Sequence, residues 1–180
     1  MIVLITGGQR SGKSSFAEKI LQDFNDVVYF ATAENCAKDG EMNARIKTHQ
    51  ERRNKNWRTV ETYKNFAEYL GHENNYLLDC VTNTVSRFMF EFTEGREKIN
   101  EKDFNKIFTT IKKTFTELFE AVNKQNLKLY LVTNEVGSAT IPMNSIARAF
   151  VDLQGLTNSF LASLADEVYF CVSGIPIKIK

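Results

Sequence analysis

The chain opens with the apolar run Ile2-Val3-Leu4-Ile5-Thr6, followed at once by Gly7-Gly8-Gln9-Arg10-Ser11-Gly12-Lys13-Ser14. The second stretch matches the pattern GxxxxGK[ST], which cradles nucleotide phosphates when it follows a strand and opens a helix. The run before it predicts a strand, and the segment Ser15–Phe24 behind it predicts a helix. This stretch therefore predicts an α/β protein that binds a nucleotide between its first strand and its first helix.

Each residue type in this phosphate loop has a physical reason. Gly7 and Gly12 permit backbone angles and a close approach that a side chain would block, so successive N–H groups can point at phosphate oxygens. We expect Lys13 to reach the β- and γ-phosphates as a catalytic residue, and the Ser14 hydroxyl to ligate Mg²⁺. The predicted nucleotide-binding residues here are Gly7, Gly8, Gln9, Arg10, Ser11, Gly12, Lys13 and Ser14.

Outward from the loop, short apolar runs alternate with segments of helical period. This alternation is typical of βαβ units around a mostly parallel sheet flanked by helices. Several runs are almost continuously apolar, as expected of strands that are covered on both faces. The predicted strands are Ile2–Thr6, Val27–Phe30, Arg58–Glu61, Tyr76–Asp79, Lys128–Thr133 and Glu167–Val172, with a further one expected at Ile177–Lys180.

The helical segments are recognised by apolar side chains three and four residues apart. The clearest pattern places eight apolar residues of Phe104–Val122 on one stripe, which we interpret as core rather than as a cofactor site. The polar stretch Thr93–Asp103 is predicted to be a surface loop between two helices. The predicted helices are Ser15–Phe24, Glu41–Arg53, Phe104–Val122 and Ser145–Ala165.

Composition narrows the function. The 180 residues carry 23 Lys and Arg against 22 Asp and Glu, so a net charge of +1 supplies no general field for DNA, RNA or a membrane surface. Any bound anion must therefore be held by a local cluster of residues and not by the net charge of the protein. The three cysteines form no CxxC pair, and no apolar stretch is long enough to span a membrane. We expect one cytoplasmic domain over residues 1–180 that binds no nucleic acid.

A phosphate loop also needs a carboxylate near the metal, usually at the end of a neighbouring apolar strand. Asp79 directly ends its apolar run and is the favoured metal ligand, while Glu135 follows another such run. Glu135 is either a second metal carboxylate or a base for a substrate hydroxyl. A helix-capping or solvated role is the alternative for each of the two.

The second candidate group surrounds a histidine. His49 lies in the predicted helix Glu41–Arg53, on the same face as Arg53, and is flanked by Arg45 and Arg52. Neighbouring guanidinium groups disfavour a protonated histidine, so His49 is expected to be neutral and nucleophilic, with arginines to hold an anionic substrate. Covalent attack on a phosphate needs this arrangement. A basic surface helix without a catalytic role accounts for the same residues.

An ordered set of motifs accompanies the phosphate loop and extends to the last residue. They are Tyr29-Phe30-Ala31-Thr32-Ala33, Asp39-Gly40-Glu41-Met42, Arg45-Ile46, His49, Trp57-Arg58-Thr59-Val60-Glu61, Leu78-Asp79-Cys80-Val81-Thr82, Val132-Thr133-Asn134-Glu135-Val136-Gly137, Ile141-Pro142, Ala165-Asp166-Glu167-Val168 and Gly174-Ile175-Pro176-Ile177-Lys178-Ile179-Lys180. With them the chain resembles the bifunctional adenosylcobinamide kinase / adenosylcobinamide-phosphate guanylyltransferases of cobalamin biosynthesis.

The resemblance implies a RecA-like P-loop NTPase fold, a homotrimer and two reactions. ATP or GTP phosphorylates adenosylcobinamide; GTP then guanylylates a histidine, and adenosylcobinamide phosphate takes up the GMP to give adenosylcobinamide-GDP. The family's guanylylated histidine falls on His49. Beyond the phosphate loop, its nucleotide contacts fall on Thr32, Ala33, Glu34, Gln50, Glu51, Arg52, Arg53, Glu61 and Asp79. The Mg²⁺ ligands stay those expected from the motif and the strand ends, Ser14, Asp79 and Glu135.

Two departures concern the corrinoid contacts. The family's second glycine after Asn-Glu-Val-Gly is replaced by Ser138-Ala139-Thr140, and its Asn-Gln pair in the last long helix is Asn158-Ser159 here. The alternative function is a P-loop kinase of another small hydroxylated metabolite. A nucleotide-switched binding module is disfavoured by the near-zero net charge and by the lack of a basic-aromatic loop for DNA.

Overall fold

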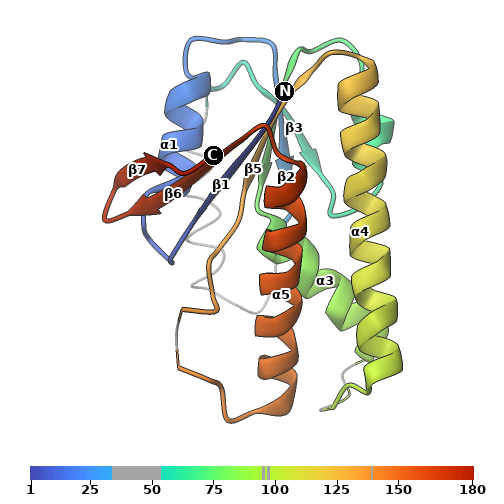
Figure 1. The fold of residues 1–180 in the computed structure, drawn as a ribbon. Coiled ribbons are helices and arrows are strands. Elements are labelled where there is room, and N and C mark those ends of the chain that lie inside the picture. Colours follow the sequence, from blue (N-terminus) through green and yellow to red (C-terminus); the bar gives the residue numbers. More distant parts are fainter. Residues whose placement is uncertain (34–53, 95, 97, 139) are drawn as a thin grey trace.

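The computed structural model describes residues 1–33, 54–94, 96, 98–138 and 140–180. Its strands form one sheet in the order β3-β2-β4-β5-β1-β6-β7, in which every neighbouring pair is parallel except β6 and β7 (Figure 1). The predicted α/β class with a mostly parallel sheet is confirmed. The strands are β1 (Ile2–Gly7), β2 (Val27–Ala31), β3 (Arg58–Glu61), β4 (Asn75–Asp79), β5 (Lys128–Val132), β6 (Glu167–Val172) and β7 (Ile175–Lys178).

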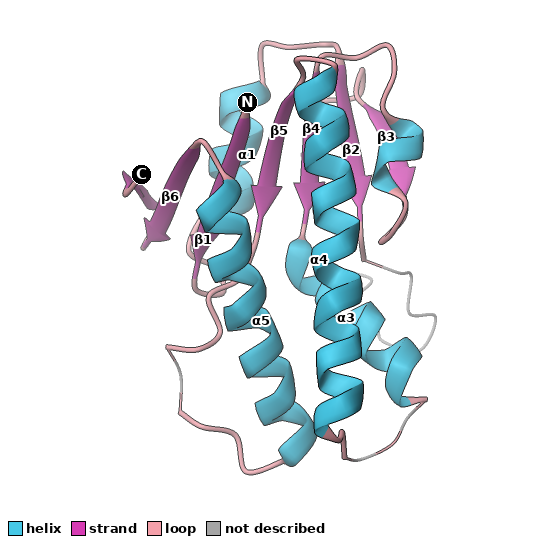
Figure 2. Ribbon diagram, turned by 45° about the vertical axis from the view of Figure 1, so that its right-hand side comes forward, coloured by secondary structure: helices cyan, strands magenta, loops and turns pink. Residues whose placement is uncertain are grey.

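Helices cover both faces of the sheet. Figure 2 shows α4 and α5 in front of the strands and α1 behind them, with α3 beyond the carboxyl ends of the strands. The helices α4 and α5 also extend beyond the carboxyl ends of the strands in both views. No helix among the described residues combines the length and the apolar character that a membrane crossing requires. The helices are α1 (Lys13–Leu21), the 3-10 helix η1 (Phe66–Tyr69), α3 (Val81–Thr93), α4 (Glu101–Lys124) and α5 (Ser145–Leu164).

The alternation of side chains along β1 explains why its sequence is apolar throughout. Ile2 and Leu4 belong to the core beneath α3, α4 and α5, whereas Val3 and Ile5 belong to the core beneath α1. All four are buried, because β1 lies inside the sheet between β5 and β6. The strand therefore ends in the middle of the carboxyl edge, where the phosphate loop follows.

The C-terminal strand begins earlier than predicted. β7 starts at Ile175 and not at Ile177, because Ser173 (φ 51°) and Gly174 (φ 85°) form a two-residue reversal directly after β6. Positive φ at both central residues gives a turn whose twist matches an antiparallel hairpin. The reversal thus returns the chain along β6 and places Ser173-Gly174 at the carboxyl edge of the sheet.

Two predicted helices have different ends in the structure. α4 begins at Glu101 and not at Phe104, because the Asn100 side chain accepts a hydrogen bond from the Asp103 amide and caps the helix. The predicted loop Thr93–Asp103 therefore shrinks at its C-terminal end. α1 spans Lys13–Leu21 instead of Ser15–Phe24, since it follows Gly12 directly and the Phe24 amide already bonds to Leu21 in a tighter turn.

Candidate active site

The phosphate loop links the buried end of β1 to α1. Gly7 and Gly12 have φ angles of 151° and 92°, which side chains rarely adopt. A Cβ on Gly7 would lie 2.4 Å from the Cys171 carbonyl oxygen. The two glycines thus give the loop its shape, as the sequence predicted.

The amino group of Lys13 folds back over this loop. Its Nζ donates to the Gly8 carbonyl at 2.6 Å and to Ser11 Oγ at 3.5 Å, and the side chain is buried. Burial lowers the pKa of Lys13, because a desolvated ammonium is costly, and the nearby acidic groups Cys80, Asp79 and Cys171 oppose this shift. A buried cation at the concave side of the loop is suited to an anionic ligand.

The β6–β7 turn forms the back of the loop. The Gly174 amide donates to the Ser11 carbonyl at 3.0 Å, and a Cβ on Gly12 would approach the Gly174 Cα to 3.0 Å. A cleft of about 330 Å³ opens beside this contact. It is lined by Gly8, Gln9, Arg10, Ser11, Glu135, Ser138, Phe170, Cys171, Val172 and Ser173.

Asp79 ends β4 at the same edge of the sheet. Tyr29 Oη on β2 donates to its Oδ2 at 3.0 Å, which fixes one carboxylate oxygen. Asp79 also contributes to the field that acts on Lys13. The structure therefore brings the favoured metal carboxylate and the phosphate-loop lysine into one electrostatic neighbourhood.

Thr32 supports the segment that follows Asp79. Its hydroxyl donates to the Cys80 carbonyl at 2.8 Å and accepts from the Cys80 amide at 2.7 Å, so both sides of the hydroxyl are engaged. Burial raises the pKa of the Cys80 thiol to about 12, so this cysteine is no nucleophile near neutral pH. Ala33 follows as a half-buried residue.

Glu135 follows β5 and reaches the phosphate-loop cleft. Its amide donates to the Gly7 carbonyl at 2.9 Å, which ties the two segments together. Its carboxylate accepts from the Gly137 amide and from Asn158 Nδ2, each at 3.4 Å. The cleft lining contains Glu135 together with the loop residues, so the second predicted carboxylate also belongs to this site.

Other predicted residues lie elsewhere. Glu61 ends β3 at the far side of the sheet, exposed, and four strand spacings of roughly 4.8 Å put it about 19 Å from β1. Glu34, Gln50, Glu51, Arg52 and Arg53, together with His49 and its predicted helix, fall outside the described residues.

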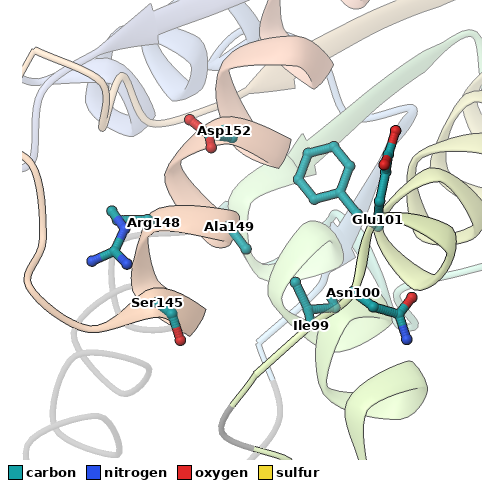
Figure 3. Close-up of a pocket in the computed structure, with 8 residues that line it drawn as sticks. Ile99, Asn100, Glu101, Ser145, Arg148, Ala149 and Asp152 are labelled. Atoms are coloured by element: carbon teal, nitrogen blue, oxygen red, sulfur yellow. The ribbon is translucent and has the colours of Figure 1, made fainter.

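A second hollow, of about 270 Å³, separates the first turns of α4 and α5 (Figure 3). Two of its polar side chains have structural roles. Asn100 caps α4, and Arg148 donates to the carbonyl groups of Pro142 and Met143. Figure 3 shows Arg148 pointing away from Ile99 and Asn100 across the hollow. Asn100 therefore stabilises the start of α4, and Arg148 stabilises the loop before α5.

The sequence analysis missed residues that support the site from neighbouring elements. Tyr29 holds Asp79 across the β2–β4 register, and the Ser173-Gly174 turn backs the phosphate loop. A Ser-Gly pair after an apolar run is a hairpin signal that the sequence does contain. Tyr29 has no comparable signal, because its contact depends on the order of strands.

The sequence matches one protein family and is similar to known proteins over its whole length. The family model described as "Cobinamide kinase / cobinamide phosphate guanyltransferase" matches residues 3–179. Over 184 aligned residues, covering 100% of each protein, the chain is 39% identical to the "Bifunctional adenosylcobalamin biosynthesis protein CobU" of Escherichia coli (strain K12). It is 38% identical, again over the full length of both, to the protein of the same name from Salmonella typhimurium (strain LT2). Among solved structures, a KaiC-like protein of Pyrococcus horikoshii OT3 aligns with TM-score 0.49 and 14% identity, covering 94% of this chain and 69% of the other.

Proposed function

The chain belongs to the cobinamide kinase / cobinamide phosphate guanyltransferase family, and we propose that its phosphate loop serves both reactions of that family's name. It is thus a bifunctional enzyme of adenosylcobalamin biosynthesis. The observation that supports a shared nucleotide site is the phosphate loop itself, because Lys13 lies over the loop backbone and within the field of Asp79. The homotrimer and the separate uses of ATP and GTP stay predictions.

In the kinase step, a hydroxyl oxygen of adenosylcobinamide attacks the γ-phosphorus of ATP or GTP. The bond between the γ-phosphorus and the β-phosphate oxygen breaks, a nucleoside diphosphate leaves, and the proton of the hydroxyl group is released to water. Lys13 counters the charge on the β- and γ-phosphates, and the backbone amides of the loop orient them. The amine acts best from a fixed place, which the contacts with Gly8 and Ser11 supply.

In the guanylyl step, the His49 imidazole attacks the α-phosphorus of GTP and pyrophosphate leaves. A phosphate oxygen of adenosylcobinamide phosphate then attacks the same phosphorus, which releases the histidine and yields adenosylcobinamide-GDP. The γ-phosphate reacts in the first step and the α-phosphate in the second. Therefore the nucleotide must present a different phosphate to the attacking group in each of the two steps.

We assign Mg²⁺ to Ser14, Asp79 and Glu135. A hydroxyl and two carboxylates are the hard oxygen donors that Mg²⁺ prefers, so these three side chains would hold the ion. Asp79 and Glu135 reach the carboxyl edge from β4 and from the segment after β5, on the side where α1 begins with Lys13-Ser14. The ion supplies charge neutralisation for the leaving phosphate.

The guanylyl step is tested with GTP labelled at either the α- or the γ-phosphate. After incubation with the enzyme and Mg²⁺ and then denaturation, we expect covalent label from the α-phosphate alone. The label should be acid-labile and base-stable, as a phosphoramidate is, and His49→Ala should abolish it. Failure to retain α-label would leave only a P-loop kinase of a hydroxylated metabolite.

The kinase step is measured separately, as transfer of the γ-phosphate to cobinamide. Lys13→Ala should lower kcat by about 10²–10³-fold, because it removes a preorganised charge next to the reacting phosphates. Lys19→Ala is the matched control, since Lys19 is exposed on the same helix. Equal losses in the two variants would contradict the assignment of Lys13.

A further inference from the structure

A polar network lies buried where α5 packs against the end of β5. Gln154, Thr157 and Asn158 are buried residues of α5, and Thr133 follows β5 with no exposed surface. Thr133 Oγ1 donates to Asn158 Oδ1 at 2.7 Å, and Gln154 Nε2 donates to Thr133 Oγ1 at 2.9 Å and to Asn158 Oδ1 at 2.8 Å. The side chains of Thr133, Gln154 and Asn158 therefore form a closed triangle of hydrogen bonds.

This triangle fixes the orientation of the Asn158 amide. Its Oδ1 accepts two hydrogen bonds, so the side that faces the active site must be the Nδ2 donor. Nδ2 donates to the Asn134 carbonyl at 3.0 Å and to Glu135 Oε2 at 3.4 Å. A rotated amide would turn an oxygen toward the Asn134 carbonyl and the Glu135 carboxylate, and would lose the two hydrogen bonds that Asn158 Oδ1 accepts.

The buried polar network lowers the stability of the fold compared with apolar side chains at the same positions. The Gln154 Oε1 atom is buried and has no hydrogen-bond partner among the described residues. Each such atom loses its hydration without compensation. Apolar side chains at these α5 positions would continue the core formed by Leu153 and Leu161. We therefore interpret the polar side chains as positioning the segment that follows β5 rather than as stabilising the fold.

We propose that Asn158 is a positioning residue, which holds the Glu135 carboxylate and the Asn134–Glu135 backbone at the phosphate-loop cleft and is itself oriented by Thr133 and Gln154. Glu135 is then held from three directions: by Asn158, by the Gly137 amide and by the contact of its own amide with Gly7. The inference rests on the proposed role of Glu135 as an active-site carboxylate. Asn158 acts only through that carboxylate and the segment that carries it.

The test is a double-mutant cycle between Asn158→Asp and Glu135→Gln. Asn158→Asp keeps the Oδ1 acceptor for Thr133 and Gln154 and the shape of the side chain, but replaces the donor to Glu135 by a second carboxylate. We expect it to lower kcat for γ-phosphate transfer about tenfold in the wild-type background and to raise the nucleotide KM by a similar factor. In the Glu135→Gln background the same substitution should lower kcat by about threefold or less, because only the contact with the Asn134 carbonyl is then lost.

A binding measurement provides a readout besides activity. By calorimetry, Asn158→Asp should weaken GDP affinity about tenfold when Mg²⁺ is present and leave it unchanged in EDTA, because the displaced carboxylate matters only with the ion. Thr157→Ala is the matched control: Thr157 is buried on the same helix, and its hydroxyl donates to the Leu153 carbonyl within that helix. It should alter neither kcat nor affinity.

Three results would overturn the inference. They are a loss of kcat in Asn158→Asp that persists with Glu135→Gln, an equal loss in Thr157→Ala, and full activity in Glu135→Gln, which would leave nothing to position. Failure of the proposed function looks different, because the wild-type enzyme would then retain no α-label from GTP and transfer no phosphate to cobinamide.

Discussion

Gly7 is the residue at which backbone conformation and packing restrict the site most tightly. Its φ of 151° is rare for side chains, and a Cβ would lie 2.4 Å from the Cys171 carbonyl oxygen and 2.7 Å from Ser11 Oγ. The neighbouring Gly8 has no atom within 4 Å of a built Cβ. Of these two adjacent glycines, Gly8 thus has space for a side chain and Gly7 does not.

We predict that Gly7→Ala lowers the free energy of unfolding by about 2–3 kcal/mol, because the clash with the Cys171 backbone adds to the strained φ. Gly8→Ala should change it by less than about 0.5 kcal/mol. Urea denaturation of both variants measures the difference. Similar midpoints for the two would show that the loop adapts to a side chain at Gly7.

At this scale the sequence predicts residues that act through local pattern and misses residues that act across the sheet. The spacing of Gly7, Gly12 and Lys13 is that of a phosphate-binding loop between a strand and a helix, so the loop could be predicted from the sequence. Asn158 was noted only as the retained member of the family's Asn-Gln pair, in which Ser159 replaces the glutamine. Its contact with Glu135 depends on how α5 lies against β5, which no local pattern in the sequence specifies.

Among the elements, the edge strand β3 depends on an ion pair. Arg58 Nε and Nη2 donate to the two carboxylate oxygens of Glu73 at 2.6 and 2.9 Å, and Nη2 also donates to the Tyr69 carbonyl. The pairing lowers the pKa of Glu73, chiefly through the hydrogen bond from Arg58. The bidentate contact thus joins β3 to the segment before β4.

We predict that Glu73→Gln lowers the free energy of unfolding by about 0.5–1 kcal/mol at neutral pH, a small value because the Arg58 side chain is 44% exposed. A depressed pKa stabilises the fold above the unfolded-state value, about 4.3 for Glu, and this contribution is lost as the pH falls through the folded-state pKa. The two proteins should therefore converge between about pH 5 and pH 3. Glu120→Gln, at an exposed position of α4, should show no such convergence if the pair is the cause.

Element types were more predictable than their ends. The apolar stripe of α4 was predicted as core, and Ile107, Ile111, Phe115 and Leu118 are indeed fully buried. The starts of α4 and β7 were wrong, because one depends on a side-chain cap by Asn100 and the other on positive φ at Ser173. Hydrophobic periodicity contains neither feature.

At the scale of the whole molecule, aromatic rings join the sheet to its helical layer. Phe115 of α4 is fully buried, with its ring centroid 6.1 Å from that of Phe66 and 6.4 Å from that of Phe119. Phe66 in turn meets Phe30 of β2 at 5.2 Å. Contacts between β2, η1 and α4 therefore stabilise the layers together.

We predict that Phe115→Ala lowers the free energy of unfolding by about 3–5 kcal/mol, since it leaves a cavity that close-packed neighbours cannot fill. Phe90→Ala provides the control, because Phe90 on α3 is 68% exposed. Chemical denaturation of the two variants gives the comparison. A loss below about 1 kcal/mol for Phe115→Ala would mean that the layers repack around the missing ring.

The turn at Ser173-Gly174 has a consequence for the order in which the enzyme is completed. The two residues that pack against the phosphate loop, Cys171 and Gly174, are synthesised some 160 residues after residues 7–14. β1 likewise lacks its partner β6 until that point. A nascent chain thus carries the nucleotide-binding motif before the backbone groups that pack against it, so the phosphate loop reaches its final shape only after the β6–β7 hairpin has been synthesised.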